Sequence, residues 1–373
     1  MAYELVQRMQ QEYKKQEGKW FSNRWHYIEA CILKAYLDHF DLKGRKEDYQ
    51  FVKDYVERLF DENGEITSIK INDYNIDQIR MATILLRLYR VEKDPKYKKV
   101  LDDLYQQRSS YPRTKQGSFW HKSNYPNQVW LDGLYMGQPF YLEYMKEFMN
   151  KKDYQDLIKQ FRHVRTYIYN EEKNLYVHAY DDSKKVFWAN KVTGQSPHVW
   201  SRAIGWYSMA LVDSIELLEG EEALQQELGK LLEELVLDVI PHQDQSGMWY
   251  QVMDYPEREG NFLETSGTLM LAYSLLKGVR IGFLQKSFQQ FGLAAYEGTV
   301  KEYLREENGE ILLGGICRSA GLGKHPDTGV MRDGSFNYYV FRERIVDNNG
   351  HGVAPLLMVY NEVLQLEKSD ILE

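Results

Sequence analysis

Two aspartates are candidates for acid-base chemistry, and Asp132 stands in a sequence that offers an ionised carboxylate no nearby partner. Asp132 lies in the apolar and aromatic run VWLDGLYM, and Asp77 lies in NDYNIDQIR. Burying an ionised carboxylate costs free energy unless the group is paired, hydrogen-bonded or protonated. A carboxyl group held among aromatic rings near a second carboxylate could keep a proton near neutral pH, which a general acid requires. The alternative is that each aspartate caps a helix, which explains Asp77 better than Asp132 because Trp130 and Leu131 are suited to packing.

Two histidines stand in segments predicted to form loops near these carboxylates. His121 follows Trp120 in SFWHKSNYP, and His178 stands in LYVHAY. Alternate residues of a strand share one face, so Tyr176, His178 and Tyr180 are predicted to form a polar and aromatic wall. A lone histidine is more often a surface or structural residue, and that interpretation is kept for the others considered: His26, His198, His242 and His325.

The segment HVWSRAIGWY adds three residues suited to an anionic sugar, Trp200, Arg202 and Trp206. Tryptophan rings stack on sugar faces, and an arginine binds a carboxylate through two hydrogen bonds. A structural role for Arg202, paired with an acid of the fold, is nearly as well supported by the sequence.

Six segments share one pattern that would place these residues together. In each, a loop rich in polar, Gly and aromatic residues runs into a long apolar helix, beginning at Trp25, Asn75, Trp130, Ser201, Glu264 and Asn349. Amphipathic, charged stretches alternate with them at residues 2–16, 46–61, 96–108, 152–164, 221–238 and 284–304. Six buried helices alternating with six half-exposed ones predict an all-α (α/α)6 barrel, with residues 1–373 as one domain. The six starts then converge at one mouth, where Asp77 and Asp132 could face each other.

The connections between helices are expected to decorate that mouth. The stretches from Leu175 and from Gly247 are predicted to form short strands or hairpins. The Gly-rich segment from Gly309 to Gly352 is too long for an empty loop, so we expect it to fold over the mouth.

Composition argues against several classes of protein. The net charge of -8 comes without a dominant Lys/Arg cluster, so a nucleic-acid partner is not expected. No segment approaches the roughly 20 apolar residues of a membrane span, and the first residues lack the apolar core of a secretory signal. We therefore expect a cytoplasmic protein without a membrane partner, monomeric or weakly homo-oligomeric. Cys31 and Cys317 stand apart, and no HxxxH or CxxC spacing occurs, so neither a disulfide framework nor a metal site is predicted.

The motifs YPNQVWLDGLYM, WSRAIGWYSMAL, FLETSGTLMLAYSLLKG and NNGHGVAPLL together resemble the unsaturated rhamnogalacturonyl hydrolases of glycoside hydrolase family 105. Their relatives are the unsaturated glucuronyl hydrolases of family 88. The resemblance implies an (α/α)6 barrel that removes a Δ4,5-unsaturated uronic acid from the non-reducing end of oligosaccharides left by polysaccharide lyases. It implies no metal or organic cofactor. It also implies that Asp132 is the general acid and base, protonating C4 of the vinyl ether while water adds at C5, and that Asp77 tunes it or orients the substrate. The implied substrate-binding residues are His121, Lys122, Trp130, His178, Trp200 and Arg202.

Unsaturated galacturonic acid linked to rhamnose is the favoured substrate, and three alternatives stay open. The first is a glucuronyl hydrolase acting on glycosaminoglycan-type disaccharides. The second is an inverting glycosidase that uses Asp77 and Asp132 across a water molecule, which needs carboxyl groups about 6.5–9.5 Å apart. The third is a carbohydrate-binding protein without activity on the same barrel, because a fold does not fix a function.

Overall fold

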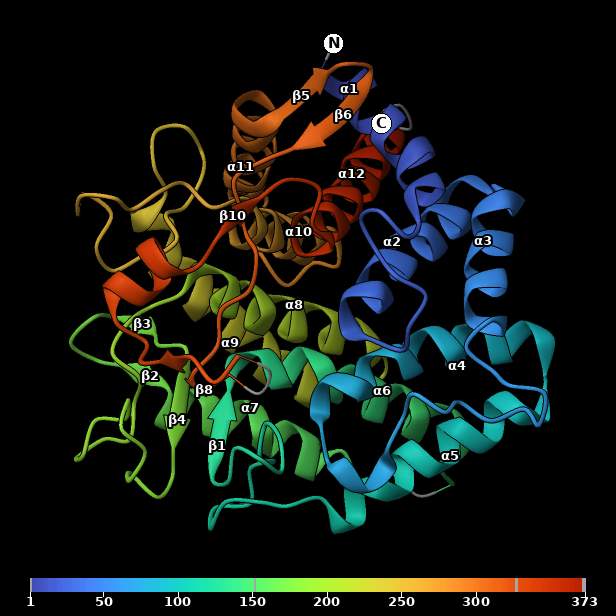
Figure 1. Ribbon diagram of the computed structural model, residues 1–373, viewed down its shortest axis with the longest axis horizontal. Coiled ribbons are helices and arrows are strands. Elements are labelled where there is room, and N and C mark those ends of the chain that lie inside the picture. The colour runs from blue at the N-terminus through green and yellow to red at the C-terminus, as the bar shows by residue number, and fades with distance from the viewer. Residues whose placement is uncertain (1, 151, 326–327, 371–373) are drawn as a thin grey trace.

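The long apolar helices form a closed inner ring (Figure 1). The computed structural model describes residues 2–150, 152–325 and 328–370. Within them, each inner helix packs against the next, and the last packs against the first. These helices are α2 (Tyr27–Lys43), α4 (Arg80–Glu92), α6 (Leu131–Phe148), α8 (Ser201–Leu217), α10 (Thr265–Arg280) and α12 (Gly350–Asp370). The (α/α)6 barrel predicted from the six repeated starts is confirmed.

The amphipathic helices form the outer ring, each against the inner helix that it adjoins along the chain. They are α3 (Lys46–Glu57), α5 (Pro95–Ser110), α7 (Gln155–Tyr167), α9 (Glu222–Val239) and α11 (Gln289–Tyr303). The N-terminal helix α1 (Ala2–Tyr13) packs against α12, so the two ends of the chain complete the barrel together. The apolar stripes of the outer helices face inward and their charged faces stay in water, as the sequence pattern predicts.

One glycine lets two inner helices cross closely. A Cβ atom on Gly267 of α10 would lie 2.6 Å from the carbonyl carbon of Ser201 and 2.8 Å from the amide nitrogen of Arg202, both on α8. Any larger residue at position 267 would push these two helices apart at the end of the barrel where both begin.

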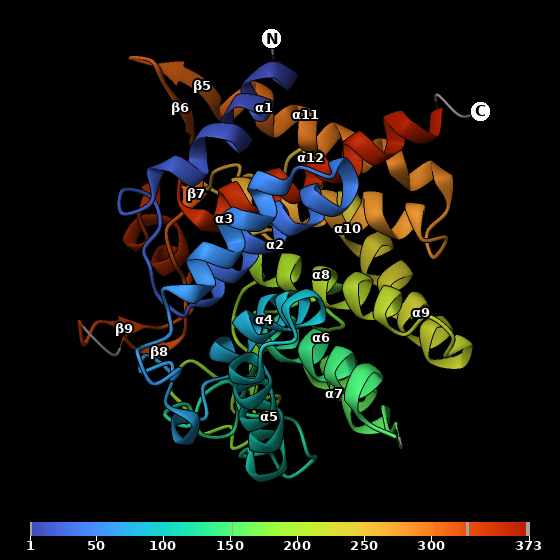
Figure 2. The same cartoon turned by 90° about the vertical axis from the view of Figure 1, so that its right-hand side faces the viewer.

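Short strands gather at that same end of the helices. The strands β1 (Gln128–Trp130) and β4 (Ala179–Asp181) are antiparallel partners, as are β2 (Tyr169–Asn170) and β3 (Leu175–Tyr176). The C-terminal half adds β5 (Leu304–Glu307) with β6 (Glu310–Leu313), β7 (Ile316–Cys317) with β10 (Ile345–Val346), and β8 (Gly323–Lys324) with β9 (Met331–Arg332). Figure 2 shows β5 to β9 together on the left of the molecule.

Two predictions about these strands are wrong in detail. Tyr176, His178 and Tyr180 do not share a strand, because β3 pairs with β2 while β4 pairs with β1, and the chain turns at His178 to change partners. The stretch from Gly247 forms no strand; it makes isolated bridges from Tyr250 to Leu263 and from Val252 to Trp200.

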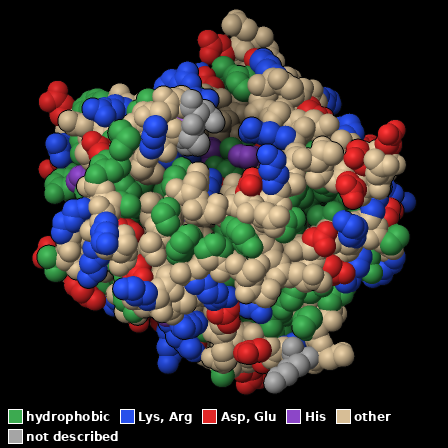
Figure 3. All heavy atoms as spheres, turned by 60° about the horizontal axis from the view of Figure 1, so that its bottom comes forward, with side chains coloured by type: hydrophobic (Ala, Val, Ile, Leu, Met, Phe, Trp, Pro, Cys, Tyr) green, Lys and Arg blue, Asp and Glu red, His purple; other side chains and the backbone are tan. Residues whose placement is uncertain are grey.

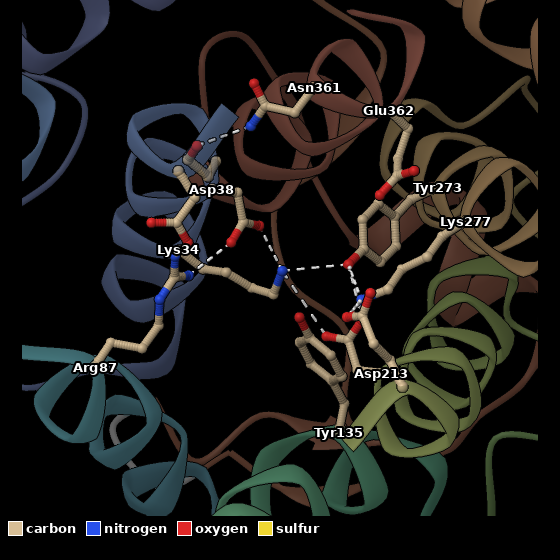
Figure 4. Close-up of polar contacts among 12 residues, drawn as sticks. Lys34, Asp38, Arg87, Tyr135, Asp213, Tyr273, Lys277, Asn361 and Glu362 are labelled. Atoms are coloured by element: carbon tan, nitrogen blue, oxygen red, sulfur yellow. Dashed lines mark hydrogen bonds and ion pairs between the residues drawn. The ribbon is translucent and has the colours of Figure 1, made fainter. Parts of the chain in front are cut away.

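The opposite end of the barrel is closed by charged side chains, the floor network (Figure 4). Lys277 Nζ lies 2.7 Å from Asp213 Oδ1, and Tyr273 donates a hydrogen bond of 2.8 Å to the same oxygen. Lys34 Nζ lies 2.5 Å from Asp38 Oδ2 and 4.0 Å from Asp213 Oδ2. Burial acts to raise the pKa of Asp213, but Lys277, Lys34 and Arg80 outweigh it and hold that pKa well below its ordinary value.

Candidate active site

A cavity of about 310 Å³ opens at the mouth, where inner helices begin. Figure 3 shows a hollow in the surface with histidine side chains in its depth and Lys and Arg side chains near its rim. Asp77 and Asp132 both line the cavity. Its other lining residues are Trp25, His26, Tyr27, Asn75, Gln78, His121, Lys122, Tyr125, Trp130, Met136, Ser319, Ala320, His325 and Arg332.

Asp132 is the second residue of α6, and its side chain does not cap that helix. The N-cap residue is Trp130, with no side-chain hydrogen bond. The Asp132 carboxylate is 14% exposed, and its Oδ2 lies 3.3 Å from Nε2 of His178. The two groups are not aligned for a hydrogen bond, and Oδ2 accepts none from the described residues. This oxygen is therefore a buried acceptor without a donor in the described part of the chain, with the His178 ring as its neighbour.

Asp77 differs from Asp132 because its negative charge is already compensated. It sits in a 3₁₀ turn, Ile76–Ile79, which Asn75 caps by accepting a hydrogen bond from the Asp77 amide, so Asp77 is not the cap either. Lys122 Nζ lies 2.7 Å from Asp77 Oδ2, and His121 Nε2 lies 3.5 Å from Oδ1. Burial acts to raise the pKa of Asp77, but Lys122 and His121 outweigh it and bring that pKa below its ordinary value. Asp77 is therefore held in its ionised form.

An aromatic stack forms one wall of the cavity. The His121 ring lies 4.4 Å from the Trp130 ring at an angle of 8°, and Trp130 lies 5.1 Å from Tyr125 at 11°. Burial lowers the pKa of His121 to about 4, so its ring is neutral at physiological pH. Such a wall presents apolar faces with polar edges, the type of surface on which sugar rings stack.

Four residues predicted to bind substrate lie behind the cavity lining: His178, Trp200, Arg202 and Trp206. His178 is fully buried, and its Nδ1 lies 2.7 Å from the Tyr339 hydroxyl. Trp200 donates a hydrogen bond of 3.0 Å to Gln251, and Trp206 stacks on Tyr135 at 5.3 Å. Of these side chains, His178 lies directly behind the lining, with its Nε2 3.3 Å from Asp132 Oδ2.

Arg202 is held by the fold rather than presented to the cavity. Its Nε donates a hydrogen bond of 2.7 Å to Ser266, and its Nη2 donates to the carbonyl of Cys317. Glu264 lies 3.7 Å from Nη2. The side chain is 1% exposed. This geometry favours the alternative kept open in the sequence analysis, pairing with a structural acid.

Several lining residues were not predicted from the sequence. His26 and His325, interpreted as surface or structural, both line the cavity, and so do Tyr27 and Tyr125. Arg332 and Ser319 come from the long Gly-rich segment, which folds over the mouth as predicted, apart from residues 326–327, which lie outside the described part of the chain. His26 was within reach of sequence reasoning, since it opens the first of the six repeated starts beside Trp25.

Among residues 2–150, 152–325 and 328–370, no cluster of three His, Cys, Asp or Glu side chains could hold a metal ion. Cys31 and Cys317 are buried and not bonded to each other. No helix in the described part of the chain has the length and apolar character needed to cross a membrane.

Comparisons with known proteins agree with this architecture. The family described as Glycosyl Hydrolase Family 88 matches residues 2–367. A solved glycoside hydrolase from family 105 of C. acetobutylicum ATCC 824 is 40% identical, with a TM-score of 0.86 over 91% of this chain and 93% of the other. The unsaturated rhamnogalacturonyl hydrolase YesR of Bacillus subtilis is 26% identical over 74% of this chain and 77% of its own length. An unsaturated glucuronyl hydrolase specific for heparin is 14% identical, with a TM-score of 0.67 over 92% of this chain and 86% of the other, which shows the fold alone.

Proposed function

Since the chain belongs to Glycosyl Hydrolase Family 88, we propose that it hydrolyses oligosaccharides ending in a Δ4,5-unsaturated uronic acid. A solved structure from family 105 is among its relatives. This membership confirms the resemblance indicated by the sequence motifs. The favoured substrate is unsaturated galacturonic acid linked to rhamnose, since the relative YesR carries a rhamnogalacturonyl name.

The unequal surroundings of the two carboxyl groups carry the proposal. Asp77 is paired with Lys122 and stays ionised, so it suits orienting the substrate. Asp132 has an oxygen without a hydrogen-bond donor, which suits a group that gives and takes a proton. When one carboxyl group of a site is the general acid and the other stays charged, the two are expected to have different environments, as these two have.

The reaction follows from that assignment. Asp132 gives its proton to C4 of the vinyl ether, and positive charge develops at C5 and the ring oxygen. Water adds to C5, and its remaining proton returns to the Asp132 carboxylate, so the acid is regenerated. The C5 hemiketal then opens to a ketone, and the hemiacetal formed at C1 collapses to an aldehyde and releases the remaining sugar as an alcohol. The balance is one water consumed for each glycosidic bond broken.

The test follows the ultraviolet absorbance of the conjugated double bond. Wild type, Asp132→Asn and Asp77→Asn are compared on unsaturated galacturonyl-rhamnose, an unsaturated chondroitin-type disaccharide and saturated galacturonyl-rhamnose. We expect decay with wild type on the first substrate and a loss of at least about 10³-fold with Asp132→Asn, the upper part of the range for losing a general acid. Asp73→Asn is the matched control and keeps full activity, because Asp73 is exposed at the end of the 3₁₀ helix Ile71–Asp73 just before Asp77.

Other outcomes would redirect the proposal. Decay only on the chondroitin-type disaccharide would move the substrate class to glycosaminoglycans. Cleavage of the saturated disaccharide without loss of absorbance would instead indicate an ordinary inverting glycosidase. Flat absorbance and no cleavage would leave a binding protein.

A further inference from the structure

A second cavity of about 480 Å³ adjoins the catalytic one. The two share five lining residues, so they are parts of one depression: His26, Tyr27, Ser319, His325 and Arg332. Five arginines line the second cavity, and we call it the arginine groove: Arg24, Arg318, Arg332, Arg342 and Arg344. Among the described residues that line the groove, Glu343 is the one carboxylate, and Tyr338 donates a hydrogen bond to it. Such a concentration of positive charge is unusual in a chain with a net charge of -8.

Arg332 lies where the two cavities meet. It is 8% exposed, and its guanidinium donates to the carbonyls of Leu322 and Gly323 and to the hydroxyl of Tyr125. These acceptors are neutral, and no carboxylate of the described residues lies within 4.0 Å of it. Burying a charge without a counter-charge costs free energy, and the described residues supply none to Arg332. An anionic ligand would supply the missing counter-charge.

The exposed members of the groove point to the same conclusion. The side chains of Arg318, Arg342 and Arg344 form no hydrogen bond or ion pair with any described residue, whereas most surface arginines of this chain, such as Arg162 with Glu227, are paired. Arg24 has one partner, Glu29, at 3.2 Å. Guanidinium groups with free donors bind carboxylates through two parallel hydrogen bonds.

We propose that the arginine groove is a subsite for a second acidic sugar of the substrate, beyond the bond that is cleaved. The catalytic cavity, at about 310 Å³, is near the lower limit of roughly 300–1,000 Å³ for ligand pockets. A longer oligosaccharide whose first sugar is in that cavity therefore continues into the groove past Arg332. The enzyme then prefers oligosaccharides that carry a further carboxylate over a disaccharide whose second sugar is neutral. This inference rests on the proposed function.

The test separates the two carboxylates that such a substrate contains. Wild type is first assayed on unsaturated galacturonyl-rhamnose, which has one carboxylate; decay of absorbance there establishes the proposed function independently. The same assay then uses the tetrasaccharide with alternating galacturonic acid and rhamnose, which adds a second carboxylate. The variants are Arg318→Gln/Arg344→Gln and Arg342→Gln, all at exposed positions where folding is not at risk, and the control is Arg162→Gln on the outer helix α7.

We expect wild-type kcat/KM to be higher on the tetrasaccharide and to fall about tenfold in the double variant, as for loss of a charge-assisted hydrogen bond. The fall in kcat/KM comes from a higher KM and becomes smaller as salt is added. It is absent when the double variant is assayed on the disaccharide and when Arg162→Gln is assayed on either substrate. Equal losses on both substrates would assign the groove to the carboxylate of the unsaturated sugar itself and overturn the proposal. Unchanged kinetics in all variants would overturn it as well.

Discussion

Replacing Lys277 with methionine tests whether the floor network stabilises the barrel. The ammonium group lies 2.7 Å from Asp213 and 2.8 Å from Glu216, and the Lys277 side chain is 4% exposed. Methionine keeps much of the length and removes the charge. Asp213 is then left buried with a hydrogen bond from Tyr273 at 2.8 Å and with Lys34 at 4.0 Å.

The size of the effect follows from burial. Removing one partner of a buried ion pair costs about 3–5 kcal/mol, because the other charge loses its compensation. Lys34 and Tyr273 still contact Asp213, so we place the loss near the lower limit, about 3 kcal/mol. With an unfolding entropy of about 2.1 cal/mol/K per residue, this lowers the melting temperature of the 373-residue chain by about 4 °C.

The pH dependence gives a second measurement. The pKa of Asp213 in the folded wild type is depressed, so its contribution to stability is present above the unfolded pKa of about 3.9 and is lost as pH falls through the folded pKa. In Lys277→Met the depression is largely removed. The stability gap between the two proteins is therefore constant from neutral pH down to about 4, and it narrows as pH falls below that value.

Thermal and urea unfolding at several pH values provide the assay. The control Lys99→Met removes an exposed partner of Asp103 and loses less than about 1 kcal/mol. The double variant Lys277→Met/Asp213→Asn is destabilised less than the sum of its single variants, since the uncompensated charge is gone. A loss below about 1 kcal/mol in Lys277→Met, or a gap that does not change below about pH 4, would show that the ion pair of Lys277 and Asp213 does not stabilise the barrel.

Two further predictions concern the mouth. Lys122→Met removes the main partner of Asp77, whose pKa in the folded protein is depressed. Because the pair is partly exposed, we expect the variant to be less stable than wild type by about 1 kcal/mol above pH ~4. This difference in stability closes at lower pH, where Asp77 is protonated. Urea unfolding measures this, with Lys122→Arg as the control that keeps the charge, and a gap that persists at low pH would contradict the cause given. Gly267→Ala brings a methyl group to within 2.6 Å of the α8 backbone, so we expect a loss of about 1–3 kcal/mol and reduced activity, measured by melting temperature and turnover. A variant with unchanged stability would show that α8 and α10 can separate without cost.

The local sequence determined the helices and their order. Repeated loops followed by apolar runs containing small residues fix where the inner helices begin, and the amphipathic stretches between them fix the outer ring. This information is local because a helix buried on most faces and a helix buried on one face differ in the pattern of their own residues. The same reasoning placed Asp77, His121 and Asp132 at one mouth. The single domain and the cytoplasmic location stay predictions.

Tertiary structure alone decided what each of these side chains does. Nothing in the sequence near Asp77 reveals that Lys122, 45 positions later, neutralises it while Asp132 keeps a free oxygen. The burial of Arg202 against Ser266 and Cys317 and the meeting of Arg332 with Tyr125 likewise join residues far apart in the chain. Charge compensation and desolvation depend on distances of a few ångströms between segments whose separation in sequence has no regular period. A pattern along the chain can therefore place a residue at the mouth, but only the packed barrel determines its partners.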